Sequence, residues 1–221
     1  MINPYPFLTE LCENNNRVWF SEHKAEYETI RQSVIADADC LIASLSEYMP
    51  ELARFSGAEC VYRIYRDVRF SPDKTPYKTH IAMGMSPTGR KMHSAGFYVQ
   101  IDPTGEFNAL WGGLFNPERE MLSKIRRAID TNAEEWTDII SDPAMLRYFP
   151  KWDGRTLKTV PKGYPKDHPL IESLRLLDLG RDHAVSREFF LDPKWYEKAA
   201  EMLSTLVPMV NFLNYSINEE I

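Results

Sequence analysis

Apolar residues recur every three or four positions near both ends of the chain, which is the spacing of α-helices. Near the N-terminus this stripe runs from Trp19 to Tyr48, with a mean repeat of about 3.6 residues. A single helix of that length would reach ~45 Å, so we expect a break near Ser21. Near the C-terminus, Asp192-Pro193 opens a helix that Pro208 is expected to kink.

The pattern between residues 58 and 115 instead alternates between apolar and polar positions, as β-strands do. Residues 96–102 and 106–111 alternate on either side of Asp102-Pro103-Thr104-Gly105, a favourable turn sequence, and predict a β-hairpin. Residues 80–85 predict another strand, and residues 61–70 predict a central strand that runs into a proline-punctuated loop. Short strands are also expected over 157–160 and 184–189.

These patterns predict one α+β domain over residues 1–221, helical over 1–50, sheet-forming over 58–115 and mostly helical over 116–221. The sheet is expected to be central and mostly antiparallel, packed by N-terminal and C-terminal helices. With 221 residues, the chain is long enough to bury a sizeable core.

The predicted central strand carries an arginine on its apolar face. Tyr62, Ile64, Arg66, Val68 and Phe70 share that face, and Arg66 stands at its centre. A buried guanidinium stays charged, so Arg66 needs a carboxylate or a bound anion. A carboxylate from a neighbouring helix or strand is the commoner solution, and a ligand is the alternative. A shift of one residue would place Arg66 on the wet face instead.

The loop after this strand adds further charged and aromatic residues, with Lys74 and Lys78 on either side of Pro76-Tyr77. Residues 54–91 contain eight Lys/Arg and three Asp/Glu, so they carry a net +5 within a chain of net charge −6. A local basic patch on an acidic protein suits a small anionic ligand better than a polyanion. The candidate ligand-binding residues are Arg63, Arg66, Asp67, Arg69, Asp73, Lys74, Tyr77 and Lys78.

Several other functional classes are disfavoured by the sequence. No apolar run approaches the ~20 residues that cross a bilayer, and the N-terminus lacks the pattern of a signal peptide. Cys12, Cys40 and Cys60 are odd in number and widely spaced, so neither a zinc site nor a disulfide framework is indicated. Residues 84–91 resemble a phosphate-binding loop but place Arg90 where that motif needs lysine. We expect a cytoplasmic protein without metal, cofactor, membrane association or general nucleic-acid binding; its oligomeric state stays open.

Several motifs resemble those of a bacterial and fungal family classed as domain of unknown function 2461. They are Asn14-Asn15 with Trp19-Phe20 and Tyr27, the run 65–78, Gly96-Phe97-Tyr98, Leu157-Lys158 before Pro161-Lys162-Gly163-Tyr164, and Asp167-His168-Pro169. The resemblance covers nearly the whole chain and implies one α+β unit. It implies no activity, cofactor or catalytic residue.

Three functional hypotheses follow for the charged segment. In the first, the basic residues bind a phosphate- or carboxylate-bearing small molecule, with Tyr65 or Tyr77 stacking on it. In the second, the chain is a hydrolase or transferase that uses Asp67 or Asp73 as base, assisted by His80 or His93. In the third, the segment is an internal ion network of a structural or interaction protein. The first is favoured, and catalytic residues stay unknown.

Overall fold

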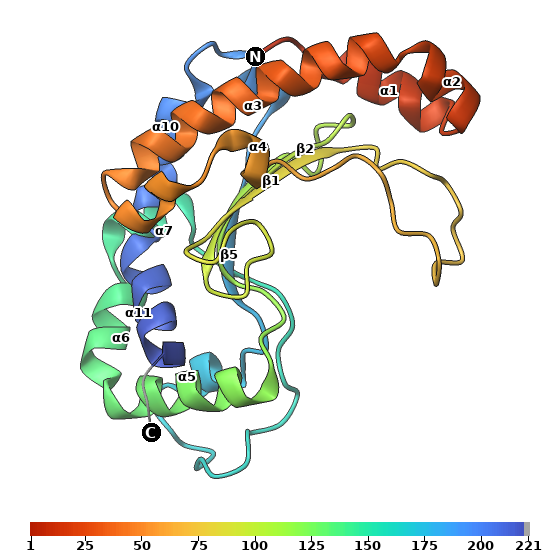
Figure 1. The fold of residues 1–221 in the computed structure, drawn as a ribbon. Helices are drawn as coiled ribbons and strands as arrows, with labels where there is room; N and C mark the ends of the chain where they lie inside the picture. Colours follow the sequence, from red (N-terminus) through yellow and green to blue (C-terminus); the bar gives the residue numbers. More distant parts are fainter. Residues whose placement is uncertain (219–221) are drawn as a thin grey trace.

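The N-terminal helices form an arc over one end of the molecule (Figure 1). The computed structural model describes residues 1–218, and the arc comprises α1 (Tyr5–Glu13), α2 (Arg17–Glu22) and α3 (Lys24–Ser46). The Asn16 side chain accepts hydrogen bonds from two backbone N–H groups and so begins α2. The expected break lies at His23, whose ring stacks on Trp19 with 4.0 Å between the ring centroids. A short 3-10 helix, η1 (Pro50–Arg54), and α4 (Gly57–Cys60) follow.

Five strands form one antiparallel sheet in the order β1-β2-β3-β5-β4. The strands are β1 (Ile81–Met85), β2 (Gly96–Ile101), β3 (Ala109–Leu114), β4 (Trp152–Asp153) and β5 (Leu179–Ala184). The expected hairpin is confirmed as β2 and β3, and the amide of Gly105 closes its turn on the carbonyl of Asp102 at 3.0 Å. The fold is therefore α+β with an antiparallel sheet, as the sequence predicts.

Helices cover one face of this sheet. The later helices are α5 (Arg119–Thr131), α6 (Ala133–Ile140), α7 (Pro143–Tyr148), α8 (Ile171–Arg175), α9 (Arg187–Leu191), α10 (Trp195–Ser204) and α11 (Val207–Asn218). Of these, α10 packs on α3 and β3, and α11 packs on β3, α5 and α6. The expected interruption near Pro208 is a break between α10 and α11 (Figure 1).

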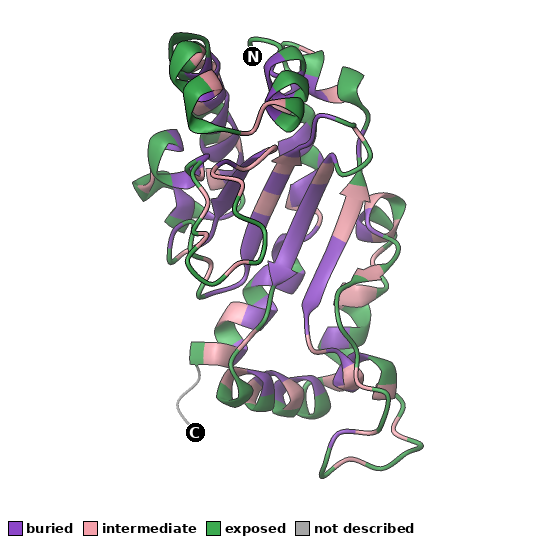
Figure 2. Ribbon diagram, turned by 90° about the vertical axis from the view of Figure 1, so that its right-hand side faces the viewer, coloured by how far each residue is buried: buried purple, intermediate pink, exposed green. Residues whose placement is uncertain are grey.

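Among residues 1–218, no helix covers the opposite face of the sheet. Figure 2 looks onto this face, and the strands are seen without a helix in front of them. The strand register places Gly96, Gly113 and Gly180 in one row across the sheet. At Gly113 the backbone has φ +140°, and a Cβ atom would lie 2.1 Å from the carbonyl oxygen of Leu179. Glycine is therefore required where these strands meet.

Three expected strands are wrong. Residues 61–70 form only isolated bridges, Val61 with Met83 and Tyr65 with Tyr77, and Phe70 is 94% exposed. Residues 157–160 form no strand. The last strand lies at Leu179–Ala184 and not at 184–189, because Ser186 accepts a hydrogen bond from the amide of Phe189 and begins α9. Residues 156 and 157 make only one bridge and one backbone hydrogen bond to residues 175 and 176, so no ladder extends over 157–160.

Candidate functional site

Residues 61–80 form an arm that projects from the β1 edge of the sheet (Figure 1). Its two legs are joined by backbone hydrogen bonds from Arg66 to Pro76 (2.9 Å) and from Lys78 to Ile64 (2.7 Å). The bridge between Val61 and Met83 attaches the arm to β1. Pro72 and Pro76 cannot donate backbone hydrogen bonds, which is why the pairing of the legs does not extend to the tip.

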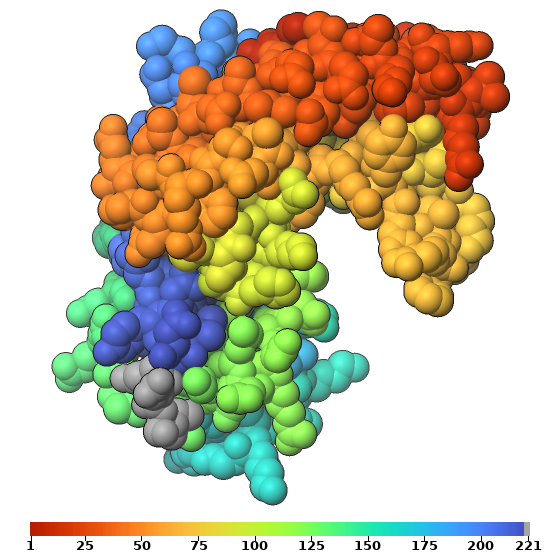
Figure 3. Space-filling model, viewed as in Figure 1, coloured from red at the N-terminus to blue at the C-terminus, as the bar shows by residue number. Residues whose placement is uncertain are grey.

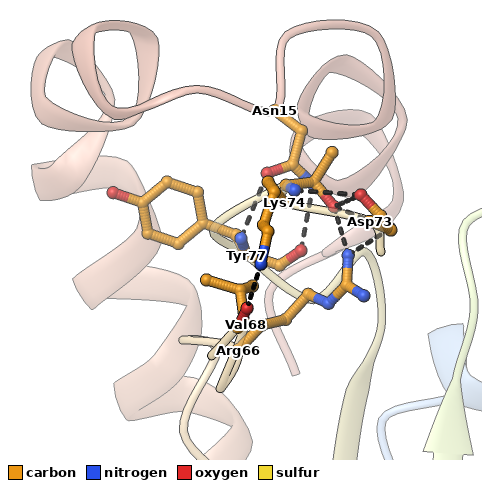
Figure 4. A network of polar contacts seen from close by, with 7 residues as sticks. Asn15, Arg66, Val68, Asp73, Lys74 and Tyr77 are labelled. Carbon is orange, nitrogen blue, oxygen red and sulfur yellow. Dashed lines mark hydrogen bonds and ion pairs between the residues drawn. The ribbon is translucent and has the colours of Figure 1, made fainter. Parts of the chain in front are cut away.

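Arg66 does meet a carboxylate, but not in the way the strand pattern implies. Its guanidinium donates to Asp73 and to the hydroxyl of Thr75, both on the returning leg of the same arm (Figure 4). The Arg66 side chain is 27% exposed, so the expectation that it is buried on an inner sheet face is wrong. The Thr75 backbone N–H and Arg66 together lower the pKa of Asp73 to about 2. This ion pair stabilises the arm's own shape.

The remaining charges near the tip also satisfy one another. Arg69 and Asp67 form an exposed two-point contact with 2.6 Å between Nη2 and Oδ2, which lowers the pKa of Asp67 to about 2. The ammonium of Lys74 donates to the backbone carbonyl of Val68 at 2.9 Å (Figure 4). These side chains therefore hold the turn together in the absence of any ligand.

The root of the arm is clamped to the N-terminal helices by Tyr77. The side chain of Asn15, in the turn between α1 and α2, donates to the Tyr77 carbonyl and accepts from its amide, at 3.0 and 3.1 Å (Figure 4). The Tyr77 ring stacks on Phe20 with 3.9 Å between the centroids, and only 6% of the residue is exposed. Tyr77 is therefore a core residue whose ring is already covered by Phe20.

Two of the eight expected residues, Arg63 and Lys78, belong to a different group of cations. The Nζ of Lys78 lies 5.1 Å from the centroid of the Tyr62 ring, and the Tyr62 hydroxyl donates to the carbonyl of Arg90. Burial lowers the pKa of Lys78, and the charges of Arg63 and Arg90 lower it further. Within residues 1–218, none of these three cations forms an ion pair with an acidic side chain.

Tyr62 also lines a cavity of about 590 Å³ on the open face of the sheet. Figure 3 shows the surface hollowed on this side, between the arm and the lower part of the molecule. The register aligns Gly84, Tyr98, Trp111 and Asp182 in one row across β1, β2, β3 and β5. Position 84 is glycine, and a Cβ atom there would lie only 2.7 Å from the Tyr62 hydroxyl oxygen. The absence of a side chain therefore lets the Tyr62 hydroxyl approach β1. Lys91 also lines the cavity.

The far end of the cavity is acidic. Asp182 on β5 and Asp153 on β4 both line it, and burial together with the charge of Asp182 raises the pKa of Asp153. The indole of Trp111 lies across Gly180, where a Cβ atom would meet its ring at 2.0 Å, and donates a hydrogen bond toward Asp153. The cavity thus joins a cationic end at the arm to an acidic end at β4 and β5.

Sequence reasoning did not find this cavity. In the hairpin, the apolar positions of 96–102 marked the core, and Tyr98 and Gln100 between them mark the open face. This alternation of apolar with polar and aromatic residues could have indicated the cavity. Large polar and aromatic side chains that face away from the core form a surface to which a ligand can bind. Asp153 and Asp182 gave no signal because β4 and β5 were not predicted there.

The histidines do not join Asp67 and Asp73. The charged neighbours of half-buried His80 are Lys78 and Asp102, and burial with the charge of Lys78 lowers its pKa. In the described part of the chain no hydrogen bond or ion pair connects His80 or His93 to either aspartate. Both aspartates are held ionised by their partners, which makes them weak bases. The geometry gives no support to the hydrolase or transferase hypothesis.

Comparison with known proteins then places the chain. A family described as conserved hypothetical protein (DUF2461) matches residues 3–212. The chain belongs to this family. No curated protein and no solved structure matches this DUF2461 chain significantly. Among residues 1–218, no helix is long and apolar enough to cross a membrane, and no group of three or more His, Cys, Asp or Glu side chains is placed to hold a metal ion.

Proposed function

We propose that this DUF2461 chain binds an anionic small molecule, bearing phosphate or carboxylate, in the cavity on the open face of its sheet. The observation that carries the proposal is the group of cations at one end. Lys91 lines the cavity there, and Lys78 lies against Tyr62, with Arg63 and Arg90 close enough to lower the pKa of Lys78. Like charges held together without carboxylate partners favour an incoming anion.

The other expected residues support this function indirectly. Arg66, Asp73 and Thr75 fix the shape of the arm, and Asn15 with Tyr77 fixes its root. These contacts within the arm and at its root hold its shape, so little conformational entropy is lost on binding. The residues of the central motif thus act as the support of the site, while Lys78 lies beside Tyr62 at its cationic end with Arg63 nearby.

We also propose that the protein works in the cytoplasm. Cys12, Cys40 and Cys60 are all unpaired, as is usual in a reducing compartment.

Thermal-shift screening against inorganic phosphate, pyrophosphate and small dicarboxylates tests the binding proposal. A ligand at a hundredfold excess over its Kd stabilises the folded state by about 2.7 kcal/mol, which raises the Tm of a chain of this size by about 5–10 °C. We expect the shift to be lost in the double variant Lys78→Met, Lys91→Met. It should persist in Lys166→Met, which removes an exposed lysine that does not line the cavity. An equal shift in all three proteins would refute the proposal.

A further inference from the structure

The two ends of the cavity set the length of the ligand. Tyr62 lies over β1, and Asp182 lies on β5, three strand spacings away in the order β1-β2-β3-β5. Neighbouring strands are about 4.8 Å apart, so the cationic and acidic ends are separated by about 14 Å. A sugar phosphate or an amino acid is too short to reach both ends.

The floor between the two ends is aromatic. Tyr98 and Trp111 are cross-strand partners in the middle of the cavity, and the indole lies across Gly180. Gln100 and Ala109 form the neighbouring pair, and Met92, Phe107 and Phe115 also line the cavity, so its walls are largely apolar and aromatic. Trp111 itself is only 8% exposed. Side chains of this kind stack on flat ring systems.

The acidic end specifies what the ring must carry. Ionised carboxylates only accept hydrogen bonds, so Asp153 and Asp182 call for a group rich in N–H or O–H donors. The exocyclic amino group of adenine, cytosine or guanine offers such donors on a flat ring, and a carboxylate is a usual partner for the amino group of cytosine.

We propose that the ligand is a nucleoside diphosphate or triphosphate whose base carries an exocyclic amino group. The phosphates lie at Lys91, which lines the cavity, with Lys78 against Tyr62 at the same end. The base packs on Tyr98 beside the largely buried Trp111, and its amino group donates to Asp182 and Asp153. This assignment rests on the anion-binding function proposed above and names the ligand class of the same site. The cavity presents Lys91 at one end and Asp153 with Asp182 at the other, as such a molecule presents its phosphates and its base; Glu106 also lines the cavity.

Isothermal titration of the full chain with ADP, CDP, GDP, UDP, ribose 5-phosphate and pyrophosphate tests the assignment. UDP is the matched control, because uracil has no exocyclic amino group. We expect at least one of the amino-bearing nucleotides to bind at least tenfold more tightly than UDP, ribose 5-phosphate or pyrophosphate. The Asp182→Ala variant should bind that nucleotide no more tightly than UDP. The Asp182→Asn variant keeps one acceptor oxygen and should retain part of the preference. Unchanged urea midpoints in both variants show that the fold is intact.

The outcomes separate the two proposals. If pyrophosphate or ribose 5-phosphate binds as tightly as every nucleotide, and Lys78→Met, Lys91→Met abolishes that binding, the nucleotide assignment is overturned while anion binding stands. If no anion binds, both are overturned. A 5′-phosphorylated oligonucleotide should bind no more tightly than the free nucleotide, since the chain carries a net charge of −6. Tighter binding of the oligonucleotide would overturn the assignment to a free nucleotide.

Discussion

Arg181 is the buried cation of this protein, and its energetics can be tested directly. Only 3% of the residue is exposed, and within residues 1–218 it has no carboxylate partner. Its guanidinium donates to the carbonyl of Phe149, which ends α7, at 2.7 Å, and to that of Ile140, the last residue of α6, at 3.4 Å. The ring of Trp152 lies 4.2 Å from its Cζ.

The carbonyl groups at two helix ends therefore take the role that a carboxylate partner would have. The C-terminal carbonyls of a helix carry partial negative charge and lack partners within the helix. Burial lowers the pKa of Arg181 to about 10, a shift that corresponds to a cost of about 3 kcal/mol for the charge. Two charge-assisted hydrogen bonds, at about 1.5–3 kcal/mol each, offset that cost. Within residues 1–218 the buried Nε has no hydrogen-bond partner, so one donor of the guanidinium stays unsatisfied.

We expect Arg181→Met to lower the free energy of unfolding by about 1–3 kcal/mol. Methionine fills most of the volume and removes the buried charge, but it leaves the two carbonyls without donors. Arg181→Ala adds a cavity and should cost about 3–5 kcal/mol. Equilibrium urea unfolding measures both, with the exposed Arg119→Met as a control that changes stability by less than about 0.5 kcal/mol. If Arg181→Met is more stable than wild type by 1 kcal/mol or more, helix ends do not compensate the charge.

Three further predictions concern single contacts. Asn15→Ala removes both clamps on Tyr77 and should cost about 1–2 kcal/mol in urea unfolding, with faster proteolysis of the arm; an unchanged cleavage rate would contradict the clamp. Gly113→Ala should cost about 3 kcal/mol or more, because its Cβ would lie 2.1 Å from the Leu179 carbonyl oxygen, and a near-wild-type Tm would refute this. Asp178 is buried, and hydrogen bonds from Arg155 lower its pKa to about 2. The ionised carboxylate therefore adds about 2 kcal/mol to the free energy of unfolding above pH 5, and this contribution is lost as the pH falls toward 2. Asp178→Asn should flatten this dependence of the free energy of unfolding on pH.

Local chemistry explains which parts of the fold could be predicted from the sequence. The β2–β3 hairpin was predictable because its alternation and its turn lie within residues 96–114, and neither needs a distant partner. The break at His23 lies two residues after Ser21, where it was expected because a single helix over residues 19–48 would reach about 45 Å. Residues 61–70 have the same alternation, but they meet β1 only at Val61 and Tyr62, so no ladder forms.

The sequence predicts a buried arginine at Arg66, but the buried arginine is Arg181 on β5. Residues 61–70 present Arg66 among apolar neighbours, which is the pattern expected for a buried charge. β5 reads Leu-Gly-Arg-Asp-His-Ala, which looks exposed. Arg181 is buried because α6 and α7, between thirty and just over forty residues earlier, bring their carbonyl ends against it. Burial of this kind depends on tertiary packing, and it cannot be predicted from the alternation of apolar and polar residues along one strand.

The candidate site shows the same difference between contacts that are close in sequence and contacts that are distant in sequence. Charges that are close in sequence, such as Asp67 with Arg69 and Arg66 with Asp73, neutralise each other within the arm. The cations at this end form no ion pair among residues 1–218: Lys78 lies on the arm, and Lys91 follows Arg90, whose guanidinium donates to the carbonyls of Glu59 and Val61. The acidic end likewise joins β4 and β5, strands separated by more than twenty residues. Folding brings like charges together at each end of the cavity and leaves the opposite charges about 14 Å apart. A ligand that spans the cavity therefore makes favourable contacts at both ends. For this reason its binding should depend on Lys78 and on Asp182 alike.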